Sequence, residues 1–209
     1  MKKLLYIIRH GETDLNKKGI VQGKGVNSPL NELGLKQAHA FYEAYKEVDF
    51  DRVYTSTLLR THQTVENFIN KGLPWEQLAG LDEISWGIYE GQEQSDKLLT
   101  GFNSITSKWS EGDLDLSVEG GETPIQVQAR QKEAIDYIVS KEEDRTILIC
   151  MHGRAMRILL CLLTNKPLSE MDDFPHMNTA LYIVSYDKGI FHIEDHYNIN
   201  HLVELERVG

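Results

Sequence analysis

The sequence predicts an α/β fold on two observations. Short apolar segments alternate with longer segments of helical periodicity over most of the chain, and this alternation is typical of parallel strands joined by right-handed helical crossovers. Two of the apolar segments, residues 4–8 and 146–151, are each followed within two residues by a His-Gly pair. Because ligands of open α/β sheets bind at the carboxyl ends of the strands, we expect both imidazoles to lie in one cleft.

The N-terminal third contains two strand–helix units. After the first strand, a polar and glycine-rich loop extends over residues 10–30. Asn31 is a suitable N-cap for a helix over residues 31–48. Its apolar residues recur at the three- and four-residue spacing of one helical face, at Leu35, Ala38, Tyr42 and Tyr45. A strand over residues 52–55 and a helix over residues 58–70 form the second unit.

Residues 87–122 differ from the rest of the chain, because they are rich in glycine and acidic residues and have weak periodicity. We interpret this segment as a helical and loop insertion. The next helix has a clear beginning, with Thr123 as N-cap, Pro124 in the first turn and Gln126 in position to complete a capping box. We expect it to extend to about residue 141.

The C-terminal part contains the second His-Gly strand, followed by a helix that is apolar on most faces. We expect this helix to be deeply packed. Two late strands, residues 180–186 and 189–195, are separated by Asp187 and Lys188, which predict a tight hairpin turn. The sequence assigns no structure to residues 196–209.

Length and composition limit the classes of function. The 209 residues suit a single domain over residues 1–209, and the hydrophobic content of 41% supplies a core. A net charge of −10 provides no positive field for nucleic acid or anionic membranes, and no apolar stretch is long enough for a transmembrane helix.

Charged residues from Arg9 onward interrupt a signal-peptide pattern, so we expect a cytoplasmic protein. Cys150 and Cys161 lie in apolar segments and are expected in the core.

The residues that follow the predicted strands suit phosphoryl transfer. A neutral imidazole, here His10, attacks phosphorus and forms an adduct that water discharges. The attack requires the nonbridging oxygens to be held, and the planar fork of arginine matches their geometry. Arg9 adjoins His10, and Arg60 lies near the start of a helix, where free N–H groups also favour anions. His152 supplies a further donor, and Gly153 begins a helix directed at the same place.

A departing alkoxide requires a proton donor, and Glu83 is the candidate acid. Burial beside Ile84 and Trp86 favours the protonated carboxyl, whereas the cations of the site favour the carboxylate. The sequence leaves open which effect is larger. Alternative acids are the nearby carboxylates of Asp82, Glu90 and Glu122.

These motifs resemble the histidine phosphatase superfamily, also called phosphoglycerate mutase-like. The segment Arg9-His10-Gly11-Glu12-Thr13-x-x-Asn16 is similar to the hallmark of that family, and Gln22-Gly23 to the loop that follows it. Further matches are Ser56-x-x-x-Arg60-x-x-Gln63-Thr64 for the second arginine, Leu81-x-Glu83 with Glu90-Gly91 for the acid, and His152-Gly153 for the late histidine. They occur in the family's order over nearly the whole chain.

The resemblance implies a three-layer sandwich in which helices flank a mixed, mostly parallel central sheet, with the insertion over the site. It implies a histidine acid phosphatase-type enzyme that forms a phosphohistidine on His10 and uses neither a metal nor a cofactor. Arg9, Arg60 and His152 then form the phosphate pocket, and Glu83 is the proton donor. The remaining phosphate- or substrate-binding positions are Asn16, Gln22, Gly23 and Gly153, although Asn16 and Gln22 equally suit turns.

Three functions are open at this point. The first is a metal-independent phosphomonoester hydrolase that acts on a small phosphorylated molecule. The second is a cofactor-dependent phosphoglycerate mutase-type phosphotransfer. Two observations argue against it: the insertion contains Lys97 and Lys108 but no Arg-Arg pair, and Gln22 occupies a position where mutases usually have threonine. The third is a catalytically silent module that binds a phosphorylated ligand. The natural substrate and the oligomeric state stay open.

Overall fold

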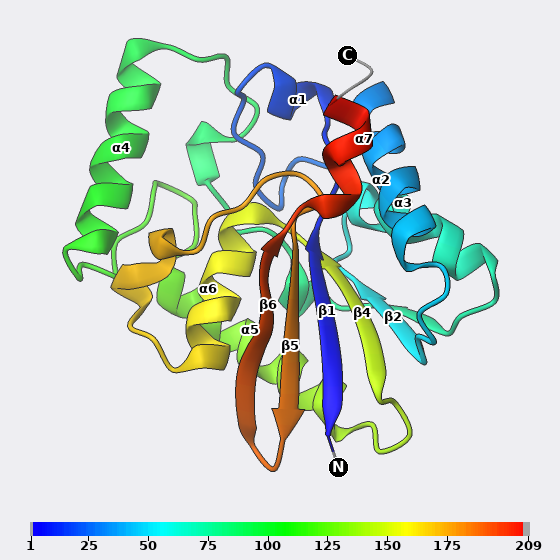
Figure 1. Cartoon of the computed structure of the whole chain (residues 1–209). Helices are drawn as coiled ribbons and strands as arrows, with labels where there is room; N and C mark the ends of the chain where they lie inside the picture. The colour runs from blue at the N-terminus through cyan, green and yellow to red at the C-terminus, as the bar shows by residue number, and fades with distance from the viewer. Residues whose placement is uncertain (1, 207–209) are drawn as a thin grey trace.

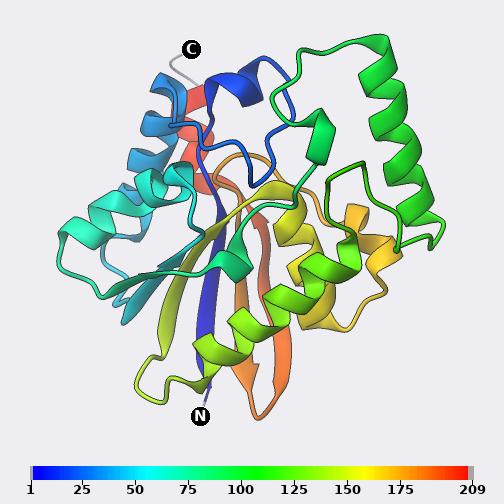
Figure 2. The ribbon, with the colours of Figure 1, turned by 180° about the vertical axis from the view of Figure 1, so that it is seen from behind.

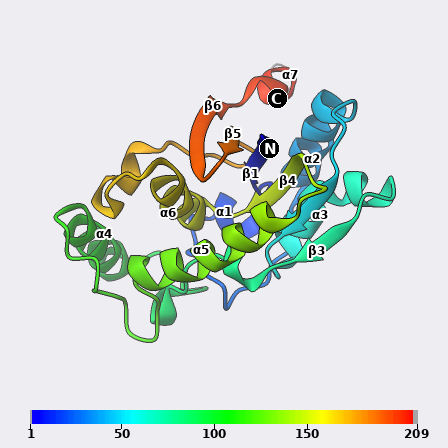
Figure 3. The ribbon, with the colours of Figure 1, turned by 90° about the horizontal axis from the view of Figure 1, so that it is seen from below.

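A six-stranded sheet forms the centre of the molecule, and helices cover both of its faces (Figures 1 and 3). The structure is a computed structural model that describes residues 2–206. The strand order is β3-β2-β4-β1-β5-β6. The strands are β1 (Lys3–Arg9), β2 (Arg52–Thr55), β3 (Trp75–Gln77), β4 (Thr146–Met151), β5 (Leu181–Asp187) and β6 (Ile190–Asn198). The predicted three-layer α/β architecture is confirmed.

The sheet is mixed, as the family resemblance implies. The pairs β1–β4, β2–β4 and β2–β3 are parallel, whereas β5 is antiparallel to both β1 and β6. The β5–β6 pair is antiparallel because only two residues connect it, Lys188 and Gly189, with φ of 50° and 87°. The turn therefore lies one residue later than predicted, since β5 includes Asp187 and Gly189 takes the second left-handed position.

Alternate side chains of the central strands enter two separate cores, because successive residues of a strand point to opposite faces. Leu5 and Ile7 belong to the core under α5 (Pro124–Ser140) and α6 (Gly153–Thr164). Ile8 belongs to the core under α2 (Glu32–Tyr45) and α3 (Leu59–Asn70). Figure 3 shows these two helix pairs on opposite sides of the sheet.

Both predicted helix starts are confirmed by their caps. The Asn31 side chain accepts a hydrogen bond from Gly34 N at the start of α2, and Thr123 forms the capping box with Gln126 at the start of α5. The buried face of α2 is centred on Ala38 and Phe41, whereas Leu35 is 51% exposed. The apolar spacing therefore predicts the helix correctly, although Leu35 lies outside its buried face.

The insertion contains η2 (Gly87–Tyr89) and α4 (Asp96–Ser110), joined by loops. Trp109 is 1% exposed and anchors α4 in the core under α5 and α6, where its ring lies 5.4 Å from that of Trp86. Figures 1 and 2 show α4 at the end of the molecule where β1 and β4 terminate. Trp109 and Val118, both buried, thus join the segment with the weakest periodicity to the main core.

The remaining elements are short. They are α1 (Asp14–Lys17), η1 (Ala79–Leu81), η3 (Leu168–Asp173), η4 (Asn200–Leu202) and α7 (Val203–Glu206). The last two occupy part of the tail that the sequence leaves unassigned, and they pack against α2 (Figure 1). Residues 207–209 of that tail lie outside the described residues. Both cysteines are buried and free, as predicted.

Candidate active site

The adjacent carboxyl ends of β1 and β4 bring the two His-Gly pairs together. Arg9 lies opposite Met151 in the parallel ladder, and His10 N donates a hydrogen bond to the Met151 carbonyl at 3.0 Å. The ring centroids of His10 and His152 are 5.1 Å apart, and the two residues are 3% and 0% exposed. The imidazoles therefore share one buried site.

One hydrogen bond determines the tautomer of His10. Its Nδ1 lies 2.7 Å from the Gly11 carbonyl oxygen. Because a carbonyl oxygen only accepts, Nδ1 carries the proton and Nε2 keeps its lone pair. Burial, followed by the nearby Arg60 and Arg9, holds the pKa of His10 well below its ordinary value. His10 is thus a neutral imidazole with Nε2 in the form that a nucleophile requires.

Arg60 is fully buried in the first turn of α3. Its Nε donates to His152 Nδ1 at 3.2 Å, its Nη1 to the Val26 carbonyl at 2.6 Å and its Nη2 to the Gly23 carbonyl at 3.4 Å. All three acceptors are uncharged. Arg60 is therefore held in place by partners that leave its positive charge available to an anion.

Arg9 is held in the same way. Its Nη1 donates to the neutral ring of His176, with 2.9 Å between Nη1 and Nδ1, and its enclosed Nε has no partner. Burial lowers the pKa of Arg9 and of Arg60 to about 10, and the charge of Glu83 is the largest opposing influence on both. Both guanidiniums are consequently charged at neutral pH.

Other arginines of the chain are paired differently. Arg130 binds the Glu122 carboxylate at 3.0 Å, and Arg52 binds Asp144 at 2.7 Å. These ion pairs cancel the charge locally, so they suit a structural role. The described hydrogen-bond partners of Arg9 and Arg60 are uncharged by contrast, so these two guanidiniums are candidates for binding an anion.

Glu83 lies at the N-terminus of α6, the helix whose N-cap residue is His152. Its Oε1 accepts hydrogen bonds from Ile84 N at 2.9 Å and Ala155 N at 2.8 Å, and its Oε2 accepts from Arg154 N at 3.1 Å. Two of these donors, Arg154 N and Ala155 N, belong to the first turn of α6, so the bonds fix the orientation of the Glu83 carboxyl group. The side chain of Glu83 is 7% exposed, and its charge acts on both Arg9 and Arg60.

The three alternative acids hold loops together. Asp82 accepts from Thr57 N at 2.8 Å, and Glu122 is paired with Arg130. Glu90 accepts from Trp86 N at 2.8 Å and from Gly25 N at 2.9 Å, so it connects the loop after β1 to the segment after Glu83. Among these four carboxylates, Glu83 is the one bound to the helix that His152 caps.

The remaining predicted binding residues shape the loops around the site. Asn16 completes a capping box with Thr13 in α1, and Gln22 Nε2 donates to Thr13 Oγ1 at 2.7 Å. A Cβ on Gly23 would lie 2.0 Å from Glu90 Oε1 and 2.8 Å from the Ile84 carbonyl oxygen, so the backbone contact favours glycine where these segments meet. Their described contacts are with the protein itself, and direct binding of substrate stays a prediction for Asn16, Gln22, Gly23 and Gly153.

The segment that precedes β5 supplies contacts to the site that no local sequence pattern indicated. Asn178 Nδ2 donates to the His10 carbonyl at 3.0 Å, and Thr179 N donates to the Arg9 carbonyl at 3.1 Å, while His176 contacts the Arg9 side chain. A signal was available: an antiparallel strand begins at the edge where its parallel neighbours end. Polar residues just before a late hairpin were therefore candidates for this edge.

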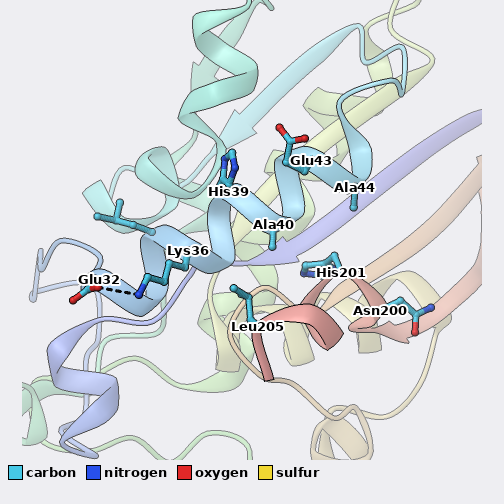
Figure 4. Close-up of a pocket in the computed structure, with 10 residues that line it drawn as sticks. Glu32, Lys36, His39, Ala40, Glu43, Ala44, Asn200, His201 and Leu205 are labelled. Atoms are coloured by element: carbon cyan, nitrogen blue, oxygen red, sulfur yellow. Dashed lines mark hydrogen bonds and ion pairs between the residues drawn. The ribbon is translucent and has the colours of Figure 1, made fainter. Parts of the chain in front are cut away.

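A separate cavity of about 790 Å³ lies between α2 and the C-terminal η4 and α7 (Figure 4). Its lining includes Leu35, Ala40, His201 and Leu205, and none of the predicted site residues. Within residues 2–206, no three His, Cys, Asp or Glu side chains are grouped as a metal site. No helix of the same described part is long and apolar enough to cross a bilayer.

Comparison with known proteins decides the family. The model of the histidine phosphatase superfamily (branch 1) matches residues 5–199. The chain belongs to this superfamily. The structure of Bacillus stearothermophilus YhfR has a similar fold, with a TM-score of 0.84 and 30% identity over 96% of this chain and 99% of that one.

Relatives of this histidine phosphatase superfamily member include named phosphatases. The mouse protein "Fructose-2,6-bisphosphatase TIGAR" is 36% identical over 139 residues, which cover 64% of this chain and 50% of that protein. The match thus spans about half the length of that relative. The Arabidopsis thaliana "Metal-independent phosphoserine phosphatase" is 28% identical over 205 residues, 90% of this chain and 82% of that protein. The resemblance identified from the motifs is confirmed.

Proposed function

We propose that this superfamily member is a metal-independent phosphomonoesterase that acts on a small phosphorylated molecule through a phosphohistidine on His10. The tautomer of His10 carries the proposal, because the 2.7 Å contact between Nδ1 and the Gly11 carbonyl leaves Nε2 unprotonated. A silent binding module would not require a neutral buried imidazole beside two charged arginines. The name of the Arabidopsis relative supports the metal-independent class.

The first half-reaction forms the phosphohistidine. His10 Nε2 attacks phosphorus in line with the leaving oxygen, a P–N bond forms and the P–O bond breaks. Arg9 and Arg60 neutralise the nonbridging oxygens of the transferring group. Glu83, whose Oε2 accepts a single described hydrogen bond of 3.1 Å, donates a proton to the leaving oxygen.

The second half-reaction restores the enzyme. Water attacks phosphorus, the P–N bond breaks, and the Glu83 carboxylate takes the proton that the water loses. Inorganic phosphate leaves, and His10 returns to its neutral form with the proton on Nδ1. In this scheme His152 acts mainly through Arg60, because its Nδ1 accepts from that guanidinium and its Nε2 lies 2.8 Å from Ser56 Oγ.

The test is hydrolysis of a panel of phosphomonoesters, with and without a chelator, by the wild type and His10→Asn. We expect chelator-resistant hydrolysis by the wild type and loss of at least about 10³-fold for the variant. A quenched wild-type reaction with labelled substrate should contain an acid-labile, alkali-stable phosphoenzyme. Activity that disappears with the chelator contradicts the metal-independent mechanism. Faster transfer between phosphoglycerates than to water supports the mutase alternative.

The matched control is His62→Asn. His62 is a half-buried histidine of α3 whose ring packs on Trp75, with centroids 4.7 Å apart. This variant should retain wild-type hydrolysis. Equal activity of His10→Asn and His62→Asn would exclude His10 as the nucleophile.

A further inference from the structure

His176, which precedes β5, contacts the guanidinium of Arg9. The distance between His176 Nδ1 and Arg9 Nη1 is 2.9 Å. Because a guanidinium only donates, His176 Nδ1 accepts and Nε2 carries the ring proton. A Cβ on Gly153 would lie 3.0 Å from His176 Cε1 and 3.3 Å from Arg9 Nε. Glycine at the start of α6 therefore leaves room for this side-chain pair.

The backbone that follows His176 is held by hydrogen bonds to the carbonyls of Arg9 and His10. Thr179 N donates to the Arg9 carbonyl at 3.1 Å, and Asn178 Nδ2 donates to the His10 carbonyl at 3.0 Å. Thr179 has a φ of 58°, which is strained for a β-branched residue and persists only where surrounding contacts impose it. The segment is thus held rigidly against the strand end that bears Arg9 and His10.

Three arginines act electrostatically on His176. Arg9 contacts it from β1, and Arg154 and Arg157 act from α6, where both also bind the Asp172 carboxylate at 2.6 Å. Burial, followed by these three arginines, lowers the pKa of His176 to about 3. The ring is therefore neutral at the pH of ordinary assays. A neutral acceptor orients Arg9 without cancelling its charge, whereas a carboxylate at the same place would cancel it.

We propose that His176 is a positioning residue, which fixes the Arg9 guanidinium for phosphate binding while leaving its positive charge uncompensated. The inference rests on the proposed function, because it assigns the part that this side chain takes in the phosphate pocket. It explains why a histidine rather than an acidic residue accompanies a buried arginine here.

The test compares three substitutions at one position. His176→Asn keeps an acceptor, because the amide oxygen of asparagine takes the place of Nδ1; His176→Leu removes the acceptor; His176→Asp keeps it and adds a negative charge. The readouts are the Kd of inorganic phosphate by calorimetry, the kcat and KM for p-nitrophenyl phosphate, and the Tm. His62→Asn is the control.

We expect His176→Asn to bind phosphate within about threefold of the wild type. His176→Leu should raise the Kd at least about tenfold, because a hydrogen bond to a charged group is lost. His176→Asp should raise it as much or more, with an undiminished Tm, because the aspartate pairs with Arg9. A purely structural role predicts the same undiminished Tm for His176→Asp, but with wild-type phosphate affinity.

Two outcomes would overturn the inference. One is wild-type phosphate affinity in a folded His176→Leu variant, and the other is equal affinity in the Asn and Asp variants. If His176→Leu fails to fold, the comparison of Asn with Asp still decides the point. A wild type that turns over no ester but binds phosphate in a His176-dependent way would contradict the proposed hydrolysis and leave the positioning role intact.

Discussion

Nε of Arg60 donates a hydrogen bond to Nδ1 of His152 at 3.2 Å. The bond leaves the ring proton on His152 Nε2, which lies 2.8 Å from Ser56 Oγ. Ser56 therefore orients His152, and His152 orients Arg60. These hydrogen bonds connect the residues that follow β2 with His152, which follows β4; the two strands are adjacent in the sheet.

Arg60→Lys tests whether the fork of the guanidinium is required. A lysine cannot bind His152 and a phosphoryl group in the same fixed geometry. We expect kcat/KM for p-nitrophenyl phosphate to fall about 10²- to 10³-fold, as for loss of one donor in an anion site. Arg52→Lys, in an ion pair with Asp144, is the control and should affect the Tm alone. Similar kinetic losses in both variants would indicate a general effect on folding.

Glu83→Gln tests whether Glu83 protonates the leaving group, by comparing esters with good and poor leaving groups. Good leaving groups need little protonation, so hydrolysis of p-nitrophenyl phosphate should fall less than about tenfold. Hydrolysis of an alkyl phosphate should fall about 10²- to 10⁴-fold, the usual contribution of general acid catalysis. Glu90→Gln should affect both esters equally, since Glu90 connects two loops. Equal losses on both esters for Glu83→Gln would assign the carboxylate to helix capping alone.

Buried neutral histidines should make the protein acid-sensitive. Burial lowers the pKa of His201 to about 4 and, together with nearby arginines, that of His176 to about 3. Below about pH 6.5 the unfolded chain binds protons at these rings and the folded protein does not. The free energy of unfolding therefore decreases as the pH is lowered, until the pH reaches the pKa values of the folded protein.

The size of this loss is measurable by urea unfolding. Each histidine should lower the free energy of unfolding by up to about 2 kcal/mol between pH 6.5 and pH 5. His201→Asn should reduce the slope of stability against pH. Equal stability of the wild type at pH 7 and pH 5 would show that these rings are protonated in the folded protein.

Gly34→Ala should be strongly destabilising despite the high helix propensity of alanine. A Cβ at Gly34 would lie 2.1 Å from the Glu12 carbonyl oxygen and 2.8 Å from Glu12 N. The backbone after His10 would have to move, at a cost of about 1–3 kcal/mol or more, and hydrolysis should fall with it. Equilibrium unfolding and kcat/KM are the measurements, and an increase in Tm would mean that helix propensity dominates.

Sequence signals predicted most elements because their causes are local. The cap at Asn31, the capping box at Thr123 and the apolar strands each depend on residues a few positions apart. Two features were not predicted, and each has a structural reason. The edge strand β3 has three residues with an exposed, intermediate, exposed pattern, too short for a periodic signal. Leu35 follows the helical spacing but is 51% exposed, because the packing of α2 against α3 and the C-terminal segment sets which face is buried.

Local patterns in the sequence are enough to predict the α/β class, the meeting of two His-Gly pairs at strand ends, and five candidate residues, namely His10, Arg9, Arg60, Glu83 and His152. How each of these side chains is held depends on the three-dimensional packing. His176 contacts Arg9 across 167 positions of sequence, because β5 pairs antiparallel to β1 and begins where β1 ends. The tautomer of His10 and the uncharged acceptors of both arginines likewise depend on contacts within the buried site, which no local pattern encodes.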